Sequence, residues 1–180
     1  MGLRILVGAV VALAALAAVV ATRPSEYRVA RATTIAAPPA AVFAQINDFH
    51  KWEAWNPWGK MDPGMKQSYE GEPVGVGAVY RWSGNNEVGE GRMTIVESRP
   101  NEQVKVQLEF YKPFAATSLA TFTLIPQGTN QTLVTWSMEG QNTFIAKAVH
   151  MVMNMDKMVG GQFEKGLAAM KTAAEAASKS

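Results

Sequence analysis

The sequence predicts an α+β domain in which an antiparallel sheet packs against a long C-terminal helix. Short runs between residues 78 and 139 alternate apolar and polar side chains, which is typical of strands with one buried face. Apolar residues then recur every three or four positions over residues 142–176, as along one face of a helix. An uncharged run over residues 5–21 precedes this domain and predicts a separate N-terminal segment.

The N-terminal run, ILVGAVVALAALAAVVA, lies between Arg4 and Arg23. As a helix it would be roughly 26 Å long, the short end of what a hydrocarbon core of about 30 Å requires. A cleaved signal peptide is the alternative, with Val19 and Ala21 as the small residues before the cleavage site, although the run is longer than a usual signal core. We therefore expect a retained single-pass transmembrane anchor over residues 1–23 and one domain over residues 24–180.

The positive charges on the two sides of this anchor are nearly equal in number, so they give only a weak indication of its orientation in the membrane. The amino terminus and Arg4 precede the run, while Arg23, Arg28 and Arg31 follow it. We take an extracytoplasmic domain as the working prediction.

Composition excludes several classes of function. Lysine and arginine number 17 against 15 aspartates and glutamates, and no run of five like charges occurs, so no nucleic-acid partner is expected. The absence of cysteine excludes disulfides, thiolate zinc sites and cysteine nucleophiles.

The first half of the domain contains a strand, a short helix and a tryptophan-rich loop. Residues 27–35 predict a strand, and Pro38 and Pro39 suit the first turn of a helix that ends near residue 46. The stretch FHKWEAWNPWGKMDP, residues 49–63, follows, and Pro57 stops any continuation of the helix there.

The second half predicts an antiparallel meander and one helix. Residues 78–82 and 91–98 form a hairpin around the turn SGNNE, and residues 104–110, 119–126 and 132–139 follow as strands. The helix over residues 142–176 is expected to be continuous, with a bend at Gly160 and Gly161.

This order of elements resembles the helix-grip fold. The stretches RATTIAAPPAAVFAQINDFHKWEAWNPW, GVGAVYRWSGN, GEGRMTIVES and MVMNMDKMVGGQFEKGLAAMK resemble the SRPBCC, or START-like, superfamily, in its polyketide cyclase/dehydrase and lipid-transport branch. The resemblance covers roughly residues 26–174. It implies a curved antiparallel sheet that wraps around the C-terminal helix, with an apolar cavity between them.

We expect aromatic and flexible apolar side chains to line this cavity or its rim, because such residues adapt to varied hydrophobic ligands. The predicted ligand-binding residues are Trp52, Trp55, Trp58, Tyr80, Trp82, Phe110, Phe122, Trp136, Met151, Met155, Val159 and Phe163. For the three tryptophans of residues 49–63, a plug of the core and a contact with a lipid surface are alternatives to the cavity rim.

No catalytic constellation is evident in the sequence. The only histidines, His50 and His150, lack metal-ligand spacing, and His50 is expected to be a partly exposed loop residue. The runs GVGAVY and GEGRM lead into strands rather than helices, so they do not predict a dinucleotide site. We therefore predict no metal, no cofactor and no catalytic residue.

The sequence thus predicts a membrane-tethered module that binds a lipid or another hydrophobic small molecule. The alternative is an enzyme resembling polyketide cyclases, which would need a buried titratable group in the cavity. A third possibility is a domain that supports only protein contacts.

Overall fold

The computed structural model describes residues 2–152 and 154–179. Seven antiparallel strands form one sheet in the order β1-β7-β6-β5-β4-β3-β2. The strands are β1 (Glu26–Ile35), β2 (Lys66–Gly71), β3 (Ala78–Ser83), β4 (Glu90–Arg99), β5 (Gln103–Lys112), β6 (Ala116–Pro126) and β7 (Thr132–Gln141). The helices are α1 (Gly2–Ala21), α2 (Pro39–Ile46), the 3-10 turns η1 (Phe49–Ala54) and η2 (Trp58–Lys60), α3 (Phe144–Val152) and α4 (Met155–Ala177).

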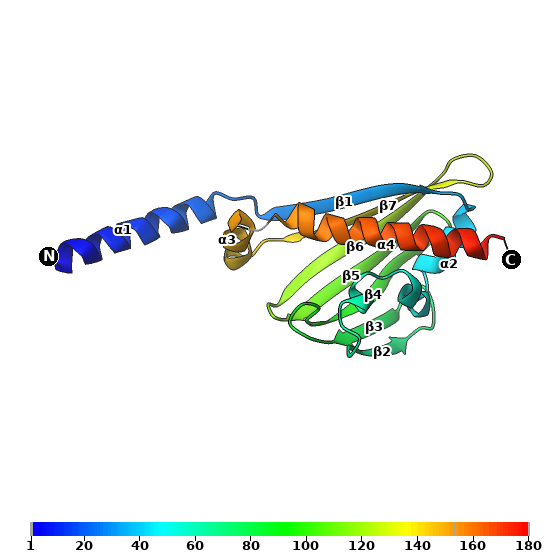
Figure 1. Cartoon of the computed structure of the whole chain (residues 1–180), viewed down its shortest axis with the longest axis horizontal. Coiled ribbons are helices and arrows are strands. Elements are labelled where there is room, and N and C mark those ends of the chain that lie inside the picture. Colours follow the sequence, from blue (N-terminus) through cyan, green and yellow to red (C-terminus); the bar gives the residue numbers. More distant parts are fainter. Residues whose placement is uncertain (1, 153, 180) are drawn as a thin grey trace.

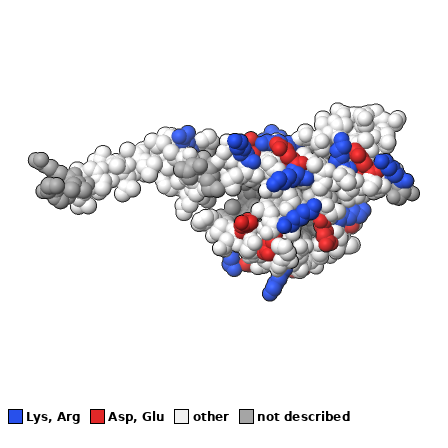
Figure 2. Space-filling view, in the orientation of Figure 1, with Lys and Arg blue, Asp and Glu red and all other residues white. Residues whose placement is uncertain are grey.

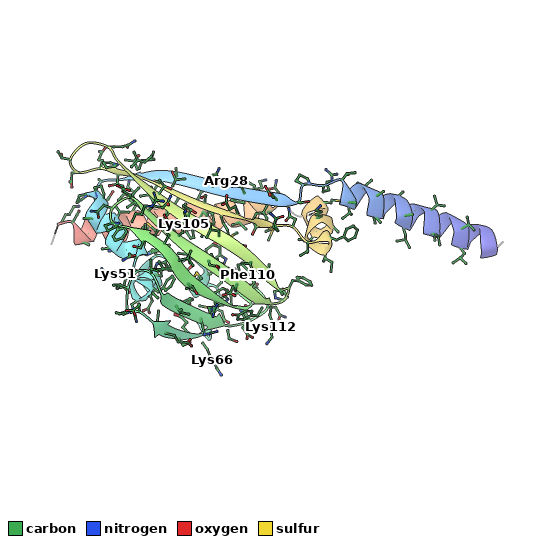
Figure 3. All side chains as sticks on the ribbon, turned by 180° about the vertical axis from the view of Figure 1, so that it is seen from behind. Arg28, Lys51, Lys66, Lys105, Phe110 and Lys112 are labelled. Carbon is green, nitrogen blue, oxygen red and sulfur yellow. The ribbon has the colours of Figure 1, made fainter. Side chains whose placement is uncertain are left out.

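The fold is the predicted α+β arrangement, consistent with a helix grip. Helix α4 lies along the concave face of the sheet beside β1, and α2 packs against it (Figure 1). Phe163, Leu167 and Met170 of α4 are buried at the interface with the sheet. Seen from behind, the outer face of the sheet has no helix over it and carries Arg28 and Lys105 (Figure 3). One sheet face is therefore buried and the other is polar, as the alternating sequence predicted.

The predicted strands are confirmed, and one strand was missed. Val104 and Val106 of β5 are fully buried, while Lys105 between them is only partly covered. Strand β2, which pairs with β3 at the edge of the sheet, escaped prediction because all six of its residues are exposed. A strand without a buried side produces no apolar alternation.

The prediction of one continuous C-terminal helix is wrong. The chain forms α3 and α4 in its place, and Asn154 is the N-cap of α4, its side chain accepting a hydrogen bond of 2.9 Å from the Lys157 amide. Gly160 and Gly161, where a bend was expected, lie inside α4. The guanidinium of Arg31 in β1 occupies the space where a Gly160 side chain would begin.

Arg31 links the first turns of α4 to the edge strand β1 through hydrogen-bonded ion pairs. Its guanidinium donates hydrogen bonds to the carboxylates of Asp156 and Glu164, at 2.9 Å and 2.7 Å. These carboxylates raise the pKa of Arg31, and Arg31 in turn lowers the pKa of Asp156. The pairs are open to solvent, so they set the position of α4 more than they stabilise the fold.

Helix α1 extends away from the domain (Figure 1). Its apolar side chains are exposed, for example Leu13 at 66% and Val11 at 62%, whereas Val20 near its end is buried. Among the described residues, no helix combines the length and the hydropathy of a membrane span, and the predicted transmembrane helix is not confirmed.

Candidate functional site

The tryptophan-rich loop folds back onto the end of α2. The indole N–H of Trp52 donates to the carbonyl of Ile46 at 2.9 Å, and that of Trp55 donates to the carbonyl of Gln45 at 3.1 Å. Carbonyls in the last turn of a helix have no partner inside the helix, so the two indoles satisfy groups that would otherwise be buried without a hydrogen bond. The loop is therefore held rigidly against the domain.

An aromatic cluster occupies the space between this loop, the sheet and α4. Trp136 of β7 stacks on Phe163 of α4, with ring centroids 4.1 Å apart, and on Phe122 of β6 at 4.9 Å. Trp55 and Trp58 meet Trp136 edge-on at 5.6 Å and 5.9 Å. These rings fill the part of the interior beneath α4 where the sequence led us to expect ligand space.

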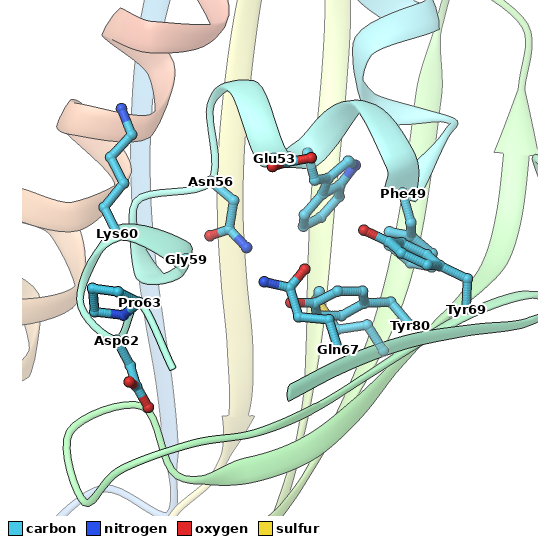
Figure 4. Close-up of a pocket in the computed structure, with 12 residues that line it drawn as sticks. Phe49, Glu53, Asn56, Gly59, Lys60, Asp62, Pro63, Gln67, Tyr69 and Tyr80 are labelled. Atoms are coloured by element: carbon cyan, nitrogen blue, oxygen red, sulfur yellow. The ribbon is translucent and has the colours of Figure 1, made fainter. Parts of the chain in front are cut away.

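A pocket of about 310 Å³ lies beside the aromatic cluster, between the tryptophan-rich loop and strands β2 to β4. Figure 4 shows the pocket in close-up. The residues that line it are Phe49, Trp52, Glu53, Asn56, Gly59, Lys60, Asp62, Pro63, Gln67, Tyr69, Tyr80 and Met93. A second depression, of about 770 Å³, is more open and is lined mainly by polar residues at the ends of β1, β6 and β7.

The floor of the pocket is apolar and rigid. Phe49, Trp52, Tyr80 and Met93 are all buried, with at most 7% of each residue exposed. The Phe49 ring meets Trp52 edge-on at 5.1 Å and approaches Tyr80 at 6.1 Å. Because Phe49, Trp52 and Tyr80 are packed against one another and against further rings, the floor exists without a ligand.

Hydrogen-bonding groups surround this floor. Tyr80, Gln67 and Asn56 point toward one another across the pocket (Figure 4). Among the described residues, neither the Tyr80 hydroxyl nor the Gln67 amide has a hydrogen-bond partner, whereas the Asn56 side chain accepts a bond of 3.2 Å from the Trp58 amide. The pocket therefore presents free donors and acceptors above an apolar surface.

Burial holds the phenols of the pocket in their neutral form. Desolvation raises the pKa of Tyr80 to about 12, and the nearby Tyr69 adds to the effect. Burial also raises the pKa of Tyr69, and the carboxylates of Glu53 and Asp48 raise it further. At neutral pH both hydroxyls can donate a hydrogen bond to a ligand.

The predicted ligand-binding residues separate into three groups. Trp52 and Tyr80 line the pocket. Buried or partly buried residues of the core, outside the pocket lining, are Trp55, Trp58, Trp82, Phe110, Phe122, Trp136, Val159 and Phe163. The two methionines lie apart from both groups, with Met155 half-buried in the first turn of α4 and Met151 exposed on α3.

Sequence reasoning missed most of the pocket lining. Gln67 and Tyr69 lie on β2, which has no burial pattern, and Met93 follows only from the pairing of β4 with β3 opposite Tyr80. The one sequence feature that could have indicated some of these residues is their position, since Phe49, Glu53 and Asn56 belong to the same loop as the tryptophans.

His50, predicted as a partly exposed loop residue, is exposed and lies in the 3-10 turn η1. Its ring stacks on Tyr69 with centroids 4.1 Å apart, and its Nδ1 lies 3.0 Å from the Asp48 carboxylate. The side chain of His150 lies outside the described residues. Within the described part of the chain, no group of three metal-ligating side chains is arranged around one point.

Solved structures resemble this fold at low sequence identity. A protein of unknown function from Staphylococcus aureus, SA2116, has a TM-score of 0.62 and 15% identity over 86% of this chain and 97% of its own. The Aha1 dimer from Colwellia psychrerythraea has a TM-score of 0.57 and 17% identity, over 83% and 96% of the two chains. Protein Mll3558 from Rhizobium loti has a TM-score of 0.53 and 22% identity, over 84% and 96%. These likenesses show the fold alone.

The sequence itself identifies the family. No curated protein is detectably similar to the chain. The family model described as polyketide cyclase/dehydrase and lipid transport, however, matches residues 26–175, from the first residue of β1 almost to the end of α4. The chain therefore belongs to the polyketide cyclase/dehydrase and lipid transport family.

Proposed function

We propose that the pocket binds a small, largely apolar molecule that carries one or two hydrogen-bonding groups. The observation that carries this proposal is the pairing of a buried aromatic floor with the unpaired groups of Tyr80 and Gln67. An apolar surface with a few convergent polar groups is the usual composition of a small-molecule site. Family membership supports a hydrophobic ligand.

The size of the pocket narrows the ligand class. At about 310 Å³ it lies at the lower end of the range of roughly 300 to 1,000 Å³ for small-molecule sites. The aromatic cluster of Trp136, Phe122 and Phe163 occupies the interior beside it. The pocket thus suits a molecule of one or two rings, or a short acyl chain, better than an intact two-chain lipid.

The test compares a variant that fills the pocket with a matched control. Gly59 lines the pocket, and a side chain added there would meet no atom within 4 Å, so Gly59→Leu fills ligand space without disturbing the core. Gly161 on α4 is equally open but lies outside the pocket lining, which makes Gly161→Leu the control. Full-length protein in detergent is titrated with 2-naphthol and with 2-acetonaphthone, and the quenching of tryptophan fluorescence is measured.

We expect saturable quenching with the wild-type chain and with Gly161→Leu. In Gly59→Leu the dissociation constant should rise about tenfold, which corresponds to ~1.4 kcal/mol. Equal affinities in the two variants would contradict the proposed site, as would the absence of saturable binding to the wild type.

One observation favours a catalytic role as the second candidate. The Tyr80 hydroxyl reaches the pocket, and burial raises its pKa to about 12. A neutral phenol can donate a hydrogen bond to a substrate carbonyl and stabilise the negative charge that develops on the carbonyl oxygen during enolisation, as a cyclase or dehydrase would require. If this role is correct, Tyr80→Phe should bind the substrate but convert it far more slowly. Equal turnover would remove the candidate.

We also propose that α1 attaches the domain to a membrane, with the domain on the extracytoplasmic side. Support comes from the exposure of its apolar side chains and from the lack of any charged residue between Arg4 and Arg23. Fractionation of cells that produce the full chain should place it with the membranes. Because the chain has no native cysteine, a single cysteine at exposed Lys66 would report its side of the membrane through labelling by an impermeant maleimide.

A further inference from the structure

Several apolar features gather at one end of the sheet. Strand register places the start of β1 opposite the end of β7, with Glu26 across from Gln141. The start of β6 pairs with this same end of β7, so the turn between β5 and β6 lies there too. Helix α1 leaves the domain at this end and α3 begins there (Figure 1).

Helix α3 presents an exposed apolar face. Phe144 is 53% exposed, Ile145 60% and Met151 38%. Met151, seven residues after Phe144, lies on the same side of the helix, and Ile145 lies about 100° around it, so the three side chains form one broad apolar face. In Figure 1, α3 runs across the direction of α1 rather than along it. If α1 crosses a flat surface at a steep angle, α3 can therefore lie along that surface with its apolar side chains against it.

Hydrogen bonds fix α3 to the segment that follows α1. The Lys147 ammonium donates to the Ser25 hydroxyl at 2.9 Å. Just before α3, the Asn142 amide donates to the Ser25 carbonyl at 2.7 Å, and its side chain donates to the carbonyl of Pro24 at 3.2 Å. The orientation of α3 at the foot of α1 is therefore set by the protein.

The turn between β5 and β6 adds a third apolar group. Phe114, in this turn, is 65% exposed at the same end of the sheet as α3. In the view of Figure 2, charged side chains of both signs spread over the domain, whereas residues 6–21 of α1 carry none. The sequence of α3, FIAKAVHMV, contains one lysine and no acidic residue.

We infer that α3 and the Phe114 turn lie on a lipid bilayer and form its contact with the domain at the foot of α1. This inference rests on the proposed membrane attachment of α1 and adds a second, peripheral contact to it. The choice of a bilayer follows from the neighbourhood of the two helices, because α3 contacts α1, whose apolar side chains are exposed. A basic residue beside an apolar helix face is typical of helices at a membrane interface. The contact would hold the domain in one orientation relative to the membrane.

The absence of cysteine permits a direct test with single fluorescent labels on the full-length chain. Cysteine replaces Ile145, Phe114 or Val10 in separate variants, and Ile125, which is 50% exposed at the opposite end of the sheet, serves as the matched control. Each variant carries the NBD fluorophore and is reconstituted in vesicles of dioleoylphosphatidylcholine. Quenching by phosphatidylcholine spin-labelled at acyl carbon 5, and by aqueous iodide, is then measured.

Labels at positions 145 and 114 should be quenched several-fold more by the spin-labelled lipid than the label at 125, and less by iodide. If position 10 is quenched by lipid while 145 and 114 match 125, α1 inserts but the proposed contact is wrong. Protection of position 145 from both quenchers would show that protein, such as a second copy, covers α3, and would also overturn the inference. Failure of lipid quenching at position 10 would remove the membrane attachment on which the inference rests.

Discussion

At the scale of single residues, two glycines of α4 differ in what surrounds them. A side chain at Gly166 would begin 2.7 Å from the Trp136 ring and 3.2 Å from Pro57, whereas one at Gly161 would meet nothing within 4 Å. Tryptophan 136 is stacked between Phe122 and Phe163, so its ring has no room to withdraw. Glycine at position 166 therefore lets the helix approach the aromatic cluster closely.

We expect Gly166→Ala to lower the free energy of unfolding by about 1–3 kcal/mol, because overpacking outweighs the higher helix propensity of alanine. Gly161→Ala should raise the same quantity by up to about 1 kcal/mol, since only the propensity changes. Urea denaturation of both variants measures the difference. A stabilised Gly166→Ala would show that the aromatic cluster is looser than its ring contacts indicate.

Tyr80 predicts a specific dependence of stability on pH. Its pKa rises from 10 in the unfolded chain to about 12 in the folded one, because burial disfavours the phenolate. The folded state therefore keeps a proton that the unfolded state loses between these pH values. The contribution of Tyr80 to stability is complete below pH 10 and is lost as the pH rises through about 12.

Absorbance at 295 nm, followed from pH 8 to 13, should show one tyrosine of the native protein ionising near pH 12. Tyr80→Phe should remove this last step and reduce the loss of stability between pH 10 and 12. Tyr111→Phe is the control, since Tyr111 is 43% exposed on β5 and lies outside the pocket lining. Persistence of the late step in Tyr80→Phe would assign it to another residue.

At the scale of elements, the N-cap of α4 explains why the C-terminal region forms two helices. Asn154 has an extended backbone conformation, and its side chain accepts a hydrogen bond from the Lys157 amide, which has no partner within the first turn of α4. We expect Asn154→Ala to lower the free energy of unfolding by about 1 kcal/mol, and Asn154→Asp to restore most of it. Thermal denaturation followed by circular dichroism measures both. Equal losses in the two variants would mean that Asn154 acts through packing rather than as a cap.

Burial patterns decide which elements could be predicted from the sequence. Strand β5 was predictable because Val104 and Val106 are buried while their neighbours are not. Strand β2 could not be predicted in this way, since it is held in the sheet by pairing with β3 and its side chains are exposed. The separation of α3 from α4 was hidden by apolar residues such as Met151 and Met155, which continue the helical period across the break.

The same distinction applies to the candidate site. The sequence located the aromatic residues of the loop, and Trp52 and Tyr80 do line the pocket. It did not show that Trp55 would be bound to the end of α2 by its indole N–H, with its ring against Trp136. Tertiary packing decides which aromatic side chains fill the core and which line a pocket. The sequence pattern is the same in the two cases, so it does not distinguish them.

At the scale of the whole molecule, α1 contributes little to the hydrophobic core of the globular part. The main cluster of buried residues draws on the sheet, α2, the tryptophan-rich loop and α4, and among the residues whose burial the structure describes it contains none before Val29. Val20 of α1, the helix that contacts α3, is buried outside this cluster. The family match also begins only at residue 26. The domain should therefore fold without its N-terminal helix.

We expect a chain that begins at residue 24 to unfold within a few degrees of the full-length protein and to keep the affinity of its pocket for 2-naphthol. Because α1 supplies the proposed attachment, the shortened chain should also leave the membrane fraction of cells. Calorimetry, fluorescence titration and fractionation measure these three outcomes separately. Gly59→Leu in the shortened chain should again weaken binding about tenfold, which would confine ligand recognition to the domain. A large fall in the unfolding temperature would instead make the junction of α1 and α3, through Val20 and Ser25, part of the folded unit.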